Sequence, residues 1–290
     1  MERNLAFYAA AAGGMLLILW CWTLRLTGSR RHTKAWRHPV LYVGPDNEIK
    51  DVLPLHPGGG EYVRIVTVSD THTQEGLLKV PPGDILIHAG DALFKNLDAN
   101  NTTSIQRVSA WLAQQCCRQQ ILIGGNHEML LDELGASESK KAFSGYIEDE
   151  LLEFEGLRIY GTPLSRPYKH GGESEDGDIL GVNKAFQTNT FARVAKIPTA
   201  NIDVLITHGA PHGILDEING NHVGCPVLMR KVQELRPRLH IFGHVHHQGA
   251  KRVLVNQGTV YVNACNLDDF APKDGGNLYP PVVIDIAKAK

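Results

Sequence analysis

The sequence has no marked excess of charge of either sign, and this limits the partners that it is expected to bind. Lysine and arginine together number 29, aspartate and glutamate 31, and the formal net charge is -2. Proteins that bind the nucleic-acid backbone usually carry a basic patch or a basic stripe. No long basic run lies in the body of this chain. The composition therefore predicts no nucleic-acid-binding surface.

Cysteine is scarce as well. The five cysteines have no regular spacing, which argues against the disulfide framework of a small secreted domain and against a Cys-x-x-Cys zinc site. The chain also has no internal repeat and no low-complexity array. What remains is 290 residues, 43% of them hydrophobic, which is enough for one large domain with a buried core and an appendage.

The longest uncharged stretch lies near the N-terminus. Residues 5–24 carry no charged side chain and have about the length that a bilayer-spanning helix requires. Arginines and a lysine follow between residues 25 and 37, so the positive-inside rule predicts a single-pass membrane protein whose body faces the cytoplasm. A cleaved secretory signal is the alternative, although the charged region before the stretch is weak. We expect residues 1–29 to be an anchor, with the membrane as a partner.

The rest of the chain divides into a linker and a domain. Residues 30–62 are first basic and then rich in proline and glycine, which predicts a linker. Residues 63–290 alternate β-branched runs with helical patterns, which predicts an α/β domain. Residues 164–181 are polar and glycine-rich, and we expect a long loop there. The predicted helices are 104–119, 183–196 and 226–235, and the predicted strands are 64–69, 84–88, 120–124, 157–161, 203–207, 238–243, 259–263 and 281–286.

Residue types that bind metals follow five of the predicted strands. They mix carboxylate, imidazole and amide groups without a thiolate, which suits Mn, Fe, Zn or Mg. More than four ligands predict two ions, and an aspartate between two ions can bridge them while the water that they share becomes the nucleophile. The groups are Asp70-Thr71-His72, Gly90-Asp91, Gly125-Asn126-His127-Glu128, Thr207-His208-Gly209 and Gly243-His244-Val245-His246.

The series D-x-H, G-D, G-N-H-E, x-H-G and G-H-x-H resembles that of the calcineurin-like metallophosphoesterases. The resemblance implies a four-layer αββα sandwich, in which helices flank two mixed sheets and the site lies at the strand ends. It also implies two divalent cations, with Mn the most expected in vitro. By motif position, one cation would be held by Asp70, His72 and His246, the other by Asn126, His208 and His244, and Asp91 would bridge them.

The same resemblance gives the neighbouring histidines their expected roles. His127 would contact the substrate phosphoryl group together with Asn126, or protonate the leaving group as a general acid. The alternative is that His127 only forms a hydrogen bond beside Asp91. His88 either orients a ligand or is a packed, hydrogen-bonded histidine. His212, His222 and His247 are interpreted as surface or rim groups.

Departures from related motifs indicate a branch of this family. Protein phosphatases carry an arginine immediately before G-N-H-E, where Gly124 stands here, and purple acid phosphatases carry a tyrosine where Phe94 stands. The longer strings resemble the branch of metallophosphoesterase-domain-containing brain proteins of the 239AB type, which is associated with phosphodiesterase activity toward cyclic nucleotides. These strings are VSDTH, ILIHAGD, GGNHE, RIYGTP, DVLITHGAP, RPRLHIFGHVH and TVYVNAC.

We therefore expect a dinuclear metal-dependent phosphoester hydrolase. The favoured activity is that of a phosphodiesterase on cyclic nucleotides or other small phosphodiesters, in which a hydroxide that bridges the metals attacks phosphorus. One alternative is a phosphomonoesterase or pyrophosphatase that acts on a nucleotide or lipid-linked substrate. Another is a membrane-tethered scaffold of low activity. The sequence leaves the oligomeric state open.

Overall fold

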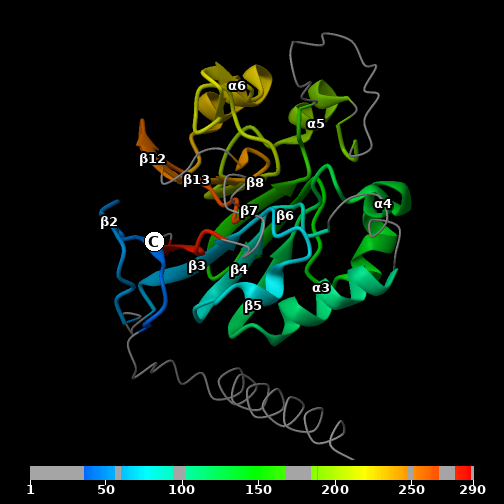
Figure 1. The fold of residues 1–290 in the computed structure, drawn as a ribbon. Helices are drawn as coiled ribbons and strands as arrows, with labels where there is room; N and C mark the ends of the chain where they lie inside the picture. Colours follow the sequence, from blue (N-terminus) through cyan, green and yellow to red (C-terminus); the bar gives the residue numbers. More distant parts are fainter. Residues whose placement is uncertain are drawn as a thin grey trace, which may run out of the picture.

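Two six-stranded sheets form the frame of the molecule (Figure 1). The computed structural model describes residues 36–55, 60–93, 102–166, 184–187, 189–246, 251–267 and 278–288. All of the strands that the sequence predicts are present among these residues.

The first sheet has the strand order β2-β1-β14-β3-β4-β5. Strands β3, β4 and β5 are parallel, β14 is antiparallel to β3, and β1 is parallel to β14. Valine and isoleucine dominate these strands, as expected where both faces of a sheet are covered. The bounds are Leu41–Val43 for β1, Ile49–Lys50 for β2, Tyr62–Val68 for β3, Gly83–His88 for β4, Cys117–Leu122 for β5 and Val282–Ala287 for β14.

The second sheet has the order β12-β13-β11-β8-β7-β6. Its four inner strands, β13, β11, β8 and β7, are parallel, and the edge strands β12 and β6 are antiparallel to their neighbours. The bounds are Glu150–Phe154 for β6, Leu157–Thr162 for β7, Val204–Thr207 for β8, Leu239–Phe242 for β11, Val253–Asn256 for β12 and Thr259–Asn263 for β13. A separate hairpin is formed by β9, Glu217–Ile218, and β10, Asn221–His222.

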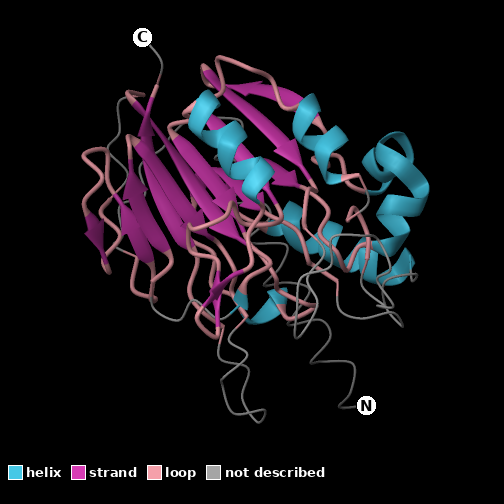
Figure 2. Ribbon diagram, turned by 90° about the horizontal axis from the view of Figure 1, so that it is seen from above, coloured by secondary structure: helices cyan, strands magenta, loops and turns pink. Residues whose placement is uncertain are grey.

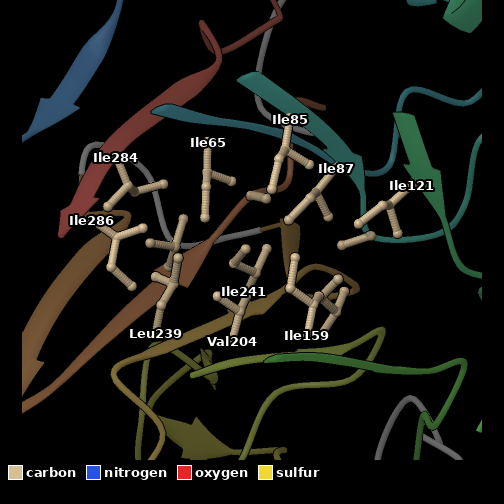
Figure 3. Close-up of a cluster of buried hydrophobic side chains, with 14 of the residues drawn as sticks. Ile65, Ile85, Ile87, Ile121, Ile159, Val204, Leu239, Ile241, Ile284 and Ile286 are labelled. Atoms are coloured by element: carbon tan, nitrogen blue, oxygen red, sulfur yellow. The ribbon is translucent and has the colours of Figure 1, made fainter. Parts of the chain in front are cut away.

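The two sheets pack face to face through a fully apolar layer. Alternate residues of each strand point to the same face of a sheet, so that every second apolar side chain enters this layer. Burial of this layer is the main apolar contribution to holding the sheets together. Figure 3 shows side chains of the first sheet, Ile65, Ile85, Ile121 and Ile284, opposite those of the second, Ile159, Val204, Leu239 and Ile241.

Helices cover the outer face of each sheet (Figures 1 and 2). Ile105 and Leu131, of α3 and α4, pack against the first sheet. Val194 and Leu228, of α5 and α6, pack against the second. This layering confirms the predicted α/β fold with two mixed sheets. The helices are η1 (Glu75–Leu77), α3 (Thr102–Gln114), α4 (Met129–Ala142), α5 (Thr190–Lys196) and α6 (Pro226–Leu235).

Part of the predicted linker, residues 30–62, belongs to the first sheet. Strand β1 pairs with β14 and β2 pairs with β1, and both lie inside that range. The run Leu41–Val43 is only three residues long and stands beside Gly44 and Pro45, so its pattern resembles that of a linker. The chain therefore enters the fold earlier than its composition indicates.

The prediction of a single-pass membrane protein is wrong in this structure. No helix formed by the described residues is both long and apolar enough to cross a bilayer. The prediction depended on apolar length, which a span requires but which does not by itself make one. The expected placement of the body in the cytoplasm depended on the same anchor and is corrected with it. Residues 5–24 themselves lie outside the described residues.

One smaller expectation also differs from the structure. Among the described residues of the helix predicted over residues 183–196, only Thr190–Lys196 are helical, because Asn189 caps the start by accepting a hydrogen bond from Ala192 N. Cys117, Cys225 and Cys265 are buried thiols outside any disulfide. Most of the loop predicted at residues 164–181 lies outside the described residues.

Candidate metal centre

The loops that follow the parallel strands carry an unusual backbone. A positive φ is uncommon for residues with a side chain, and it concentrates at functional sites. Four of the predicted site residues have one: Asp70 (φ 51°), His72 (φ 44°), Asp91 (φ 52°) and His244 (φ 68°). These turns direct the polar side chains into the space beyond the strand ends instead of into the neighbouring loops.

The first group of side chains comes from β3 and β11. His246 Nε2 lies 3.1 Å from Asp70 Oδ1, and His72 Nε2 lies 3.5 Å from His246 Nε2. The backbone N–H of His244 donates to both oxygens of Asp70, at 3.1 and 3.0 Å, and so fixes the carboxylate. Asp70 and His72 are buried. The structure thus brings Asp70, His72 and His246 together, as predicted.

The second group comes from β5, β8 and β11. His208 Nε2 lies 3.0 Å from Asn126 Oδ1, and the rings of His208 and His244 have their centroids 5.0 Å apart. Ligand atoms of Asp91, His208 and His244 all lie within 4.8 Å of one another. Asn126, His208 and His244 are therefore also brought together.

Asp91 lies between the two groups. Its Oδ2 is 3.3 Å from His208 Nε2 in the second group and 4.0 Å from His72 Nε2 in the first. Its Oδ1 accepts a hydrogen bond of 2.9 Å from the backbone N–H of His127, and Oδ2 lies 3.7 Å from the Nε2 of the same residue. This is the location that a bridging carboxylate requires.

The protonation pattern of two histidines tests whether cations fit this site. His72 Nδ1 lies 3.0 Å from Leu93 O and His208 Nδ1 lies 2.9 Å from Ala89 O, and a carbonyl oxygen can only accept. Each Nδ1 therefore carries the proton, and in the neutral ring Nε2 presents a lone pair. Both lone pairs face Asp91 Oδ2, so two nitrogen acceptors and one oxygen acceptor lie close together. They repel one another unless a positive charge, either a proton or a metal ion, lies between them. The combination of carboxylate and imidazole groups fits a divalent cation.

The pKa shifts agree with that interpretation. Burial lowers the pKa of His72 to about 4, and burial together with His208 lowers the pKa of His244 to about 3. Both rings are therefore neutral, which metal binding requires. Burial acts against ionisation of Asp91, but His208 and His127 hold its pKa well below the usual range. Burial also opposes protonation of His208, yet the Asp91 carboxylate outweighs it and raises the pKa of His208 to about 9. A proton on Nε2 of His208 can therefore supply the positive charge beside Asp91, and a metal ion that binds there must displace that proton.

Comparison with known proteins decides what kind of site this is. Residues 55–248, most of the chain, match the family described as calcineurin-like phosphoesterase. The chain belongs to this family. Its members use divalent metals, and the chain is therefore a metal-dependent phosphoesterase.

Several relatives match over most of their length. The chain is 32% identical to the human metallophosphoesterase domain-containing protein 1, over 80% of this chain and 73% of the relative. It is 30% identical to a Caenorhabditis elegans protein of the UPF0046 group, over 83% and 81% of the two chains. The crystal structure of a phosphopantetheinyl hydrolase from Mycobacterium tuberculosis resembles the fold with a TM-score of 0.43, at 16% identity, over 71% of this chain and 90% of that one.

Glu128, to which the sequence assigned no role, ties two loops of this phosphoesterase site together. Its carboxylate accepts from the backbone N–H groups of Asp91 (2.9 Å), Gly125 (2.6 Å) and Leu93 (2.9 Å). Burial and the charge of Asp91 raise the pKa of Glu128 to about 7. The only signal in the sequence was its place at the end of the G-N-H-E motif.

Glycine is required at two motif positions because side chains of other loops come very close to the backbone there. A Cβ at Gly125 would overlap the carboxylate of Asp91, and a Cβ at Gly243 would overlap Ser69 Oγ and the carboxylate of Asp70. Only glycine, which has no side chain, allows the two loops to come this close to the site.

The remaining histidines divide between the interior and the rim. His88 is fully buried, and its Nε2 lies 3.0 Å from Thr71 Oγ1. This contact favours the packed, hydrogen-bonded interpretation. His212 and His222 are about half exposed and lie beside Asp216, at 3.9 and 2.7 Å. His247 lies outside the described residues.

Proposed function

We propose that this phosphoesterase hydrolyses small phosphodiesters, cyclic nucleotides among them, at a two-metal centre. The observation that carries the proposal is the place of Asp91, whose Oδ2 faces a histidine of each group at 3.3 and 4.0 Å. One carboxylate can then serve both cations. The first would be held by Asp70, His72 and His246, and the second by Asn126, His208 and His244.

Two divalent cations in this cage would supply an activated water and would neutralise charge on the phosphoryl oxygens. The residues of the chain hold the cage in shape. One backbone N–H is shared by both oxygens of Asp70 and another fixes Asp91, so neither carboxylate has to reorganise when substrate arrives. Asn126 lies beside His127 in sequence, and we assign it to substrate contact as well as to the second cation.

We assign to His127 the protonation of the leaving oxygen. Its side chain is 12% exposed, whereas that of Asp91, with which it pairs, is 2% exposed, so the imidazole lies at the opening of the site. The ring stands 4.5 Å from that of His72, edge to face. A group at the boundary between the metal cage and solvent can deliver a proton to a departing alkoxide and can then take another from water.

The surroundings of Gly124 support a diester over a monoester. Protein phosphatases place an arginine here, which neutralises the second charge of a monoester. In this chain a Cβ at Gly124 would overlap the buried ring of Phe186, so no side chain can enter the site from this position. A diester carries a single negative charge and does not need the additional cation.

The test is a comparison of diester and monoester turnover on the full-length protein. With Mn²⁺ added, kcat/KM for bis-p-nitrophenyl phosphate and for 2′,3′- or 3′,5′-cyclic nucleotides should exceed that for p-nitrophenyl phosphate by about tenfold or more, equivalent to about 1.4 kcal/mol. Chelation should abolish all turnover, and Mn²⁺ should restore it. A faster monoester reaction would contradict the proposed substrate class.

The matched variants are Asp91→Asn and Asp46→Asn, the second of which lies in an exposed loop. Because Asp91 would serve both cations, its loss should lower turnover on the order of a thousandfold and reduce bound metal at both positions. Asp46→Asn should behave like the wild type. Full metal content in Asp91→Asn would contradict the bridging role.

A further inference from the structure

A thiol lies against the first group of metal-binding side chains. Ligand atoms of Asp70, His246 and Cys265 all lie within 4.8 Å of one another. Cys265 is 4% exposed and follows β13, the strand beside β11 in the second sheet. Neither the motifs of the sequence nor the proposed two-metal centre gives this residue a role.

The backbone holds Cys265 in this place. Residues Ser69 and Cys265 form a parallel bridge, in which Asn266 N donates to Ser69 O at 2.8 Å and Ser69 N donates to Asn266 Oδ1 at 3.0 Å. Cys265 N donates to Asn263 Oδ1 at 3.0 Å. Because Asp70 follows Ser69 directly, the thiol and the carboxylate are fixed relative to each other by hydrogen bonds on both sides.

A buried cation accompanies the thiol. Arg252 is 4% exposed, and its Nη2 has no hydrogen-bond partner among the described residues, although Nε and Nη1 donate to Asn263 O and Pro280 O. Burial lowers the pKa of Arg252 to about 10, and Cys265, Tyr279 and Asp70 are near enough to oppose that effect. Burial of the guanidinium charge is costly unless an anion lies nearby. A thiolate at Cys265 would provide one.

We propose that the thiolate of Cys265 is a further ligand of the cation held by Asp70 and His246. The proposal depends on the two-metal centre of the proposed function. A neutral buried thiol that only packs is the alternative, and Cys265 Sγ does lie 3.6 Å from Leu267 O. The group Asp70, His246 and Cys265 nevertheless has the composition of a site for a softer cation than one of carboxylate and imidazole alone.

A thiolate ligand changes which cation the first position selects. Thiolates favour Zn²⁺, Co²⁺ and Fe²⁺ over Mn²⁺, whereas carboxylate and water suit Mn²⁺. The first position should therefore prefer the softer cations over Mn²⁺ more strongly than the second position, which has no thiol.

The test uses absorption by Co²⁺, which reports a sulfur ligand independently of catalysis. The full-length protein, reduced and stripped of metal, is titrated with Co²⁺. We expect a sulfur-to-cobalt charge-transfer band in the near ultraviolet, and we expect Cys265→Ser to lose this band while it keeps the visible d–d bands. Cys225→Ser is the matched control, since Cys225 is equally buried and caps α6 by accepting from Leu228 N at 3.4 Å.

Competition between metals gives a second readout. Removal of one ligand should weaken Zn²⁺ binding to Cys265→Ser by about tenfold or more, with a smaller change for Mn²⁺. If the variant fails to fold, X-ray absorption of the Zn²⁺-loaded wild type replaces it, with sulfur expected at about 2.3 Å from zinc.

The outcomes separate this inference from the proposed function. A charge-transfer band that persists in Cys265→Ser, or a zinc spectrum without sulfur, would overturn the thiolate ligand and leave the two-metal centre standing. Absence of Co²⁺ binding to the wild type would overturn the metal centre and the thiolate with it. Loss of the band in Cys265→Ser alone would support the inference.

Discussion

Two buried histidines each lie beside a threonine that directly precedes a site histidine. His88 Nε2 contacts Thr71 Oγ1 and His240 Nε2 contacts Thr207 Oγ1, both at 3.0 Å. Burial lowers the pKa of His88 to about 4 and that of His240 to about 3, from an ordinary 6.5. Both rings are therefore neutral in the folded chain near neutral pH, and in each the Nδ1 atom has no hydrogen-bond partner among the described residues.

This burial predicts a specific sensitivity to acid. Below the ordinary pKa of 6.5 the unfolded chain protonates His240 and the folded chain does not, so the free energy of unfolding falls as the pH drops toward 3. His240→Gln cannot titrate. It should be less stable than the wild type at pH 7, and this deficit should shrink by about 1.4 kcal/mol for each pH unit below about 6.

Urea unfolding at several pH values measures this deficit. Thr207→Val is the control, because it removes the hydroxyl that contacts His240 but keeps the imidazole. It should be destabilised with the pH dependence of the wild type. A deficit in His240→Gln that stays constant between pH 7 and 4 would show that this histidine does not set the acid sensitivity.

Among the structural elements, the loop after β11 lies very close to Ser69 and Asp70. A Cβ at Gly243 would meet Ser69 Oγ and Asp70 Oδ2 at once. We expect Gly243→Ala to displace the Asp70 carboxylate, to cost about 1–3 kcal/mol of the free energy of unfolding and to reduce metal binding in the first group.

The matched control is Gly76→Ala, in η1, where a Cβ meets nothing within 4 Å. This variant should change the free energy of unfolding by less than about 0.5 kcal/mol. Unfolding midpoints and metal content of both proteins decide the matter. A Gly243→Ala protein with wild-type stability and metal content would mean that the loop can shift without disturbing Asp70.

A helix or strand could be predicted where its burial produces a clear apolar pattern in its sequence. Apart from the three-residue β1, the inner strands are buried on both faces and have largely apolar sequences, so they were predicted. Edge strands β6 and β12 carry partly polar sequences, ELLEF and VLVN, and were missed. Helix α4 was also missed, because Gly135 at φ 74° interrupts it and its apolar periodicity is weak.

Across the whole molecule, the structure separates catalysis from stability. The site lies beyond the carboxyl ends of the parallel strands, whereas Arg64 near the start of β3 forms a buried pair with Asp285 of β14, at 2.6 and 2.8 Å. Tyr42 of β1 donates to the same carboxylate at 3.0 Å. Three strands of the first sheet are thus joined at the end away from the site.

Removal of one partner of the Arg64–Asp285 pair should therefore lower the free energy of unfolding and leave kcat unchanged. Arg64→Met leaves Asp285 buried and uncompensated, and we expect it to lower the free energy of unfolding by about 3–5 kcal/mol. The kcat of the folded fraction with Mn²⁺ should stay at the wild-type value. The exposed pair of Lys141 with Glu138 provides the control, since Lys141→Met should cost less than about 1 kcal/mol. A loss of kcat in a folded Arg64→Met protein would refute the separation.

The convergence of the site was predictable from the sequence, but its finer contacts were not. Asp70 and Asp91 each follow a parallel strand of the first sheet, and the carboxyl ends of such strands meet at one edge. His208 follows β8 of the second sheet, and only the family resemblance grouped it with them. The approach of Cys265 to Asp70 depends instead on how the loop after β13 in the second sheet meets the loop after β3 in the first. No local pattern along the chain records a contact between two sheets.

The position of β14 has a consequence for how the protein is synthesised. This strand lies inside the first sheet and joins β1 to β3, yet it follows every other described strand in sequence. The strands of the second sheet all lie between residues 150 and 263, so their pairing does not require β14. The first sheet must wait, with β1 separated from β3, until Val282–Ala287 has been made. Premature termination before this segment would leave two adjacent apolar edges open, and a nascent chain in that state is a substrate for chaperones.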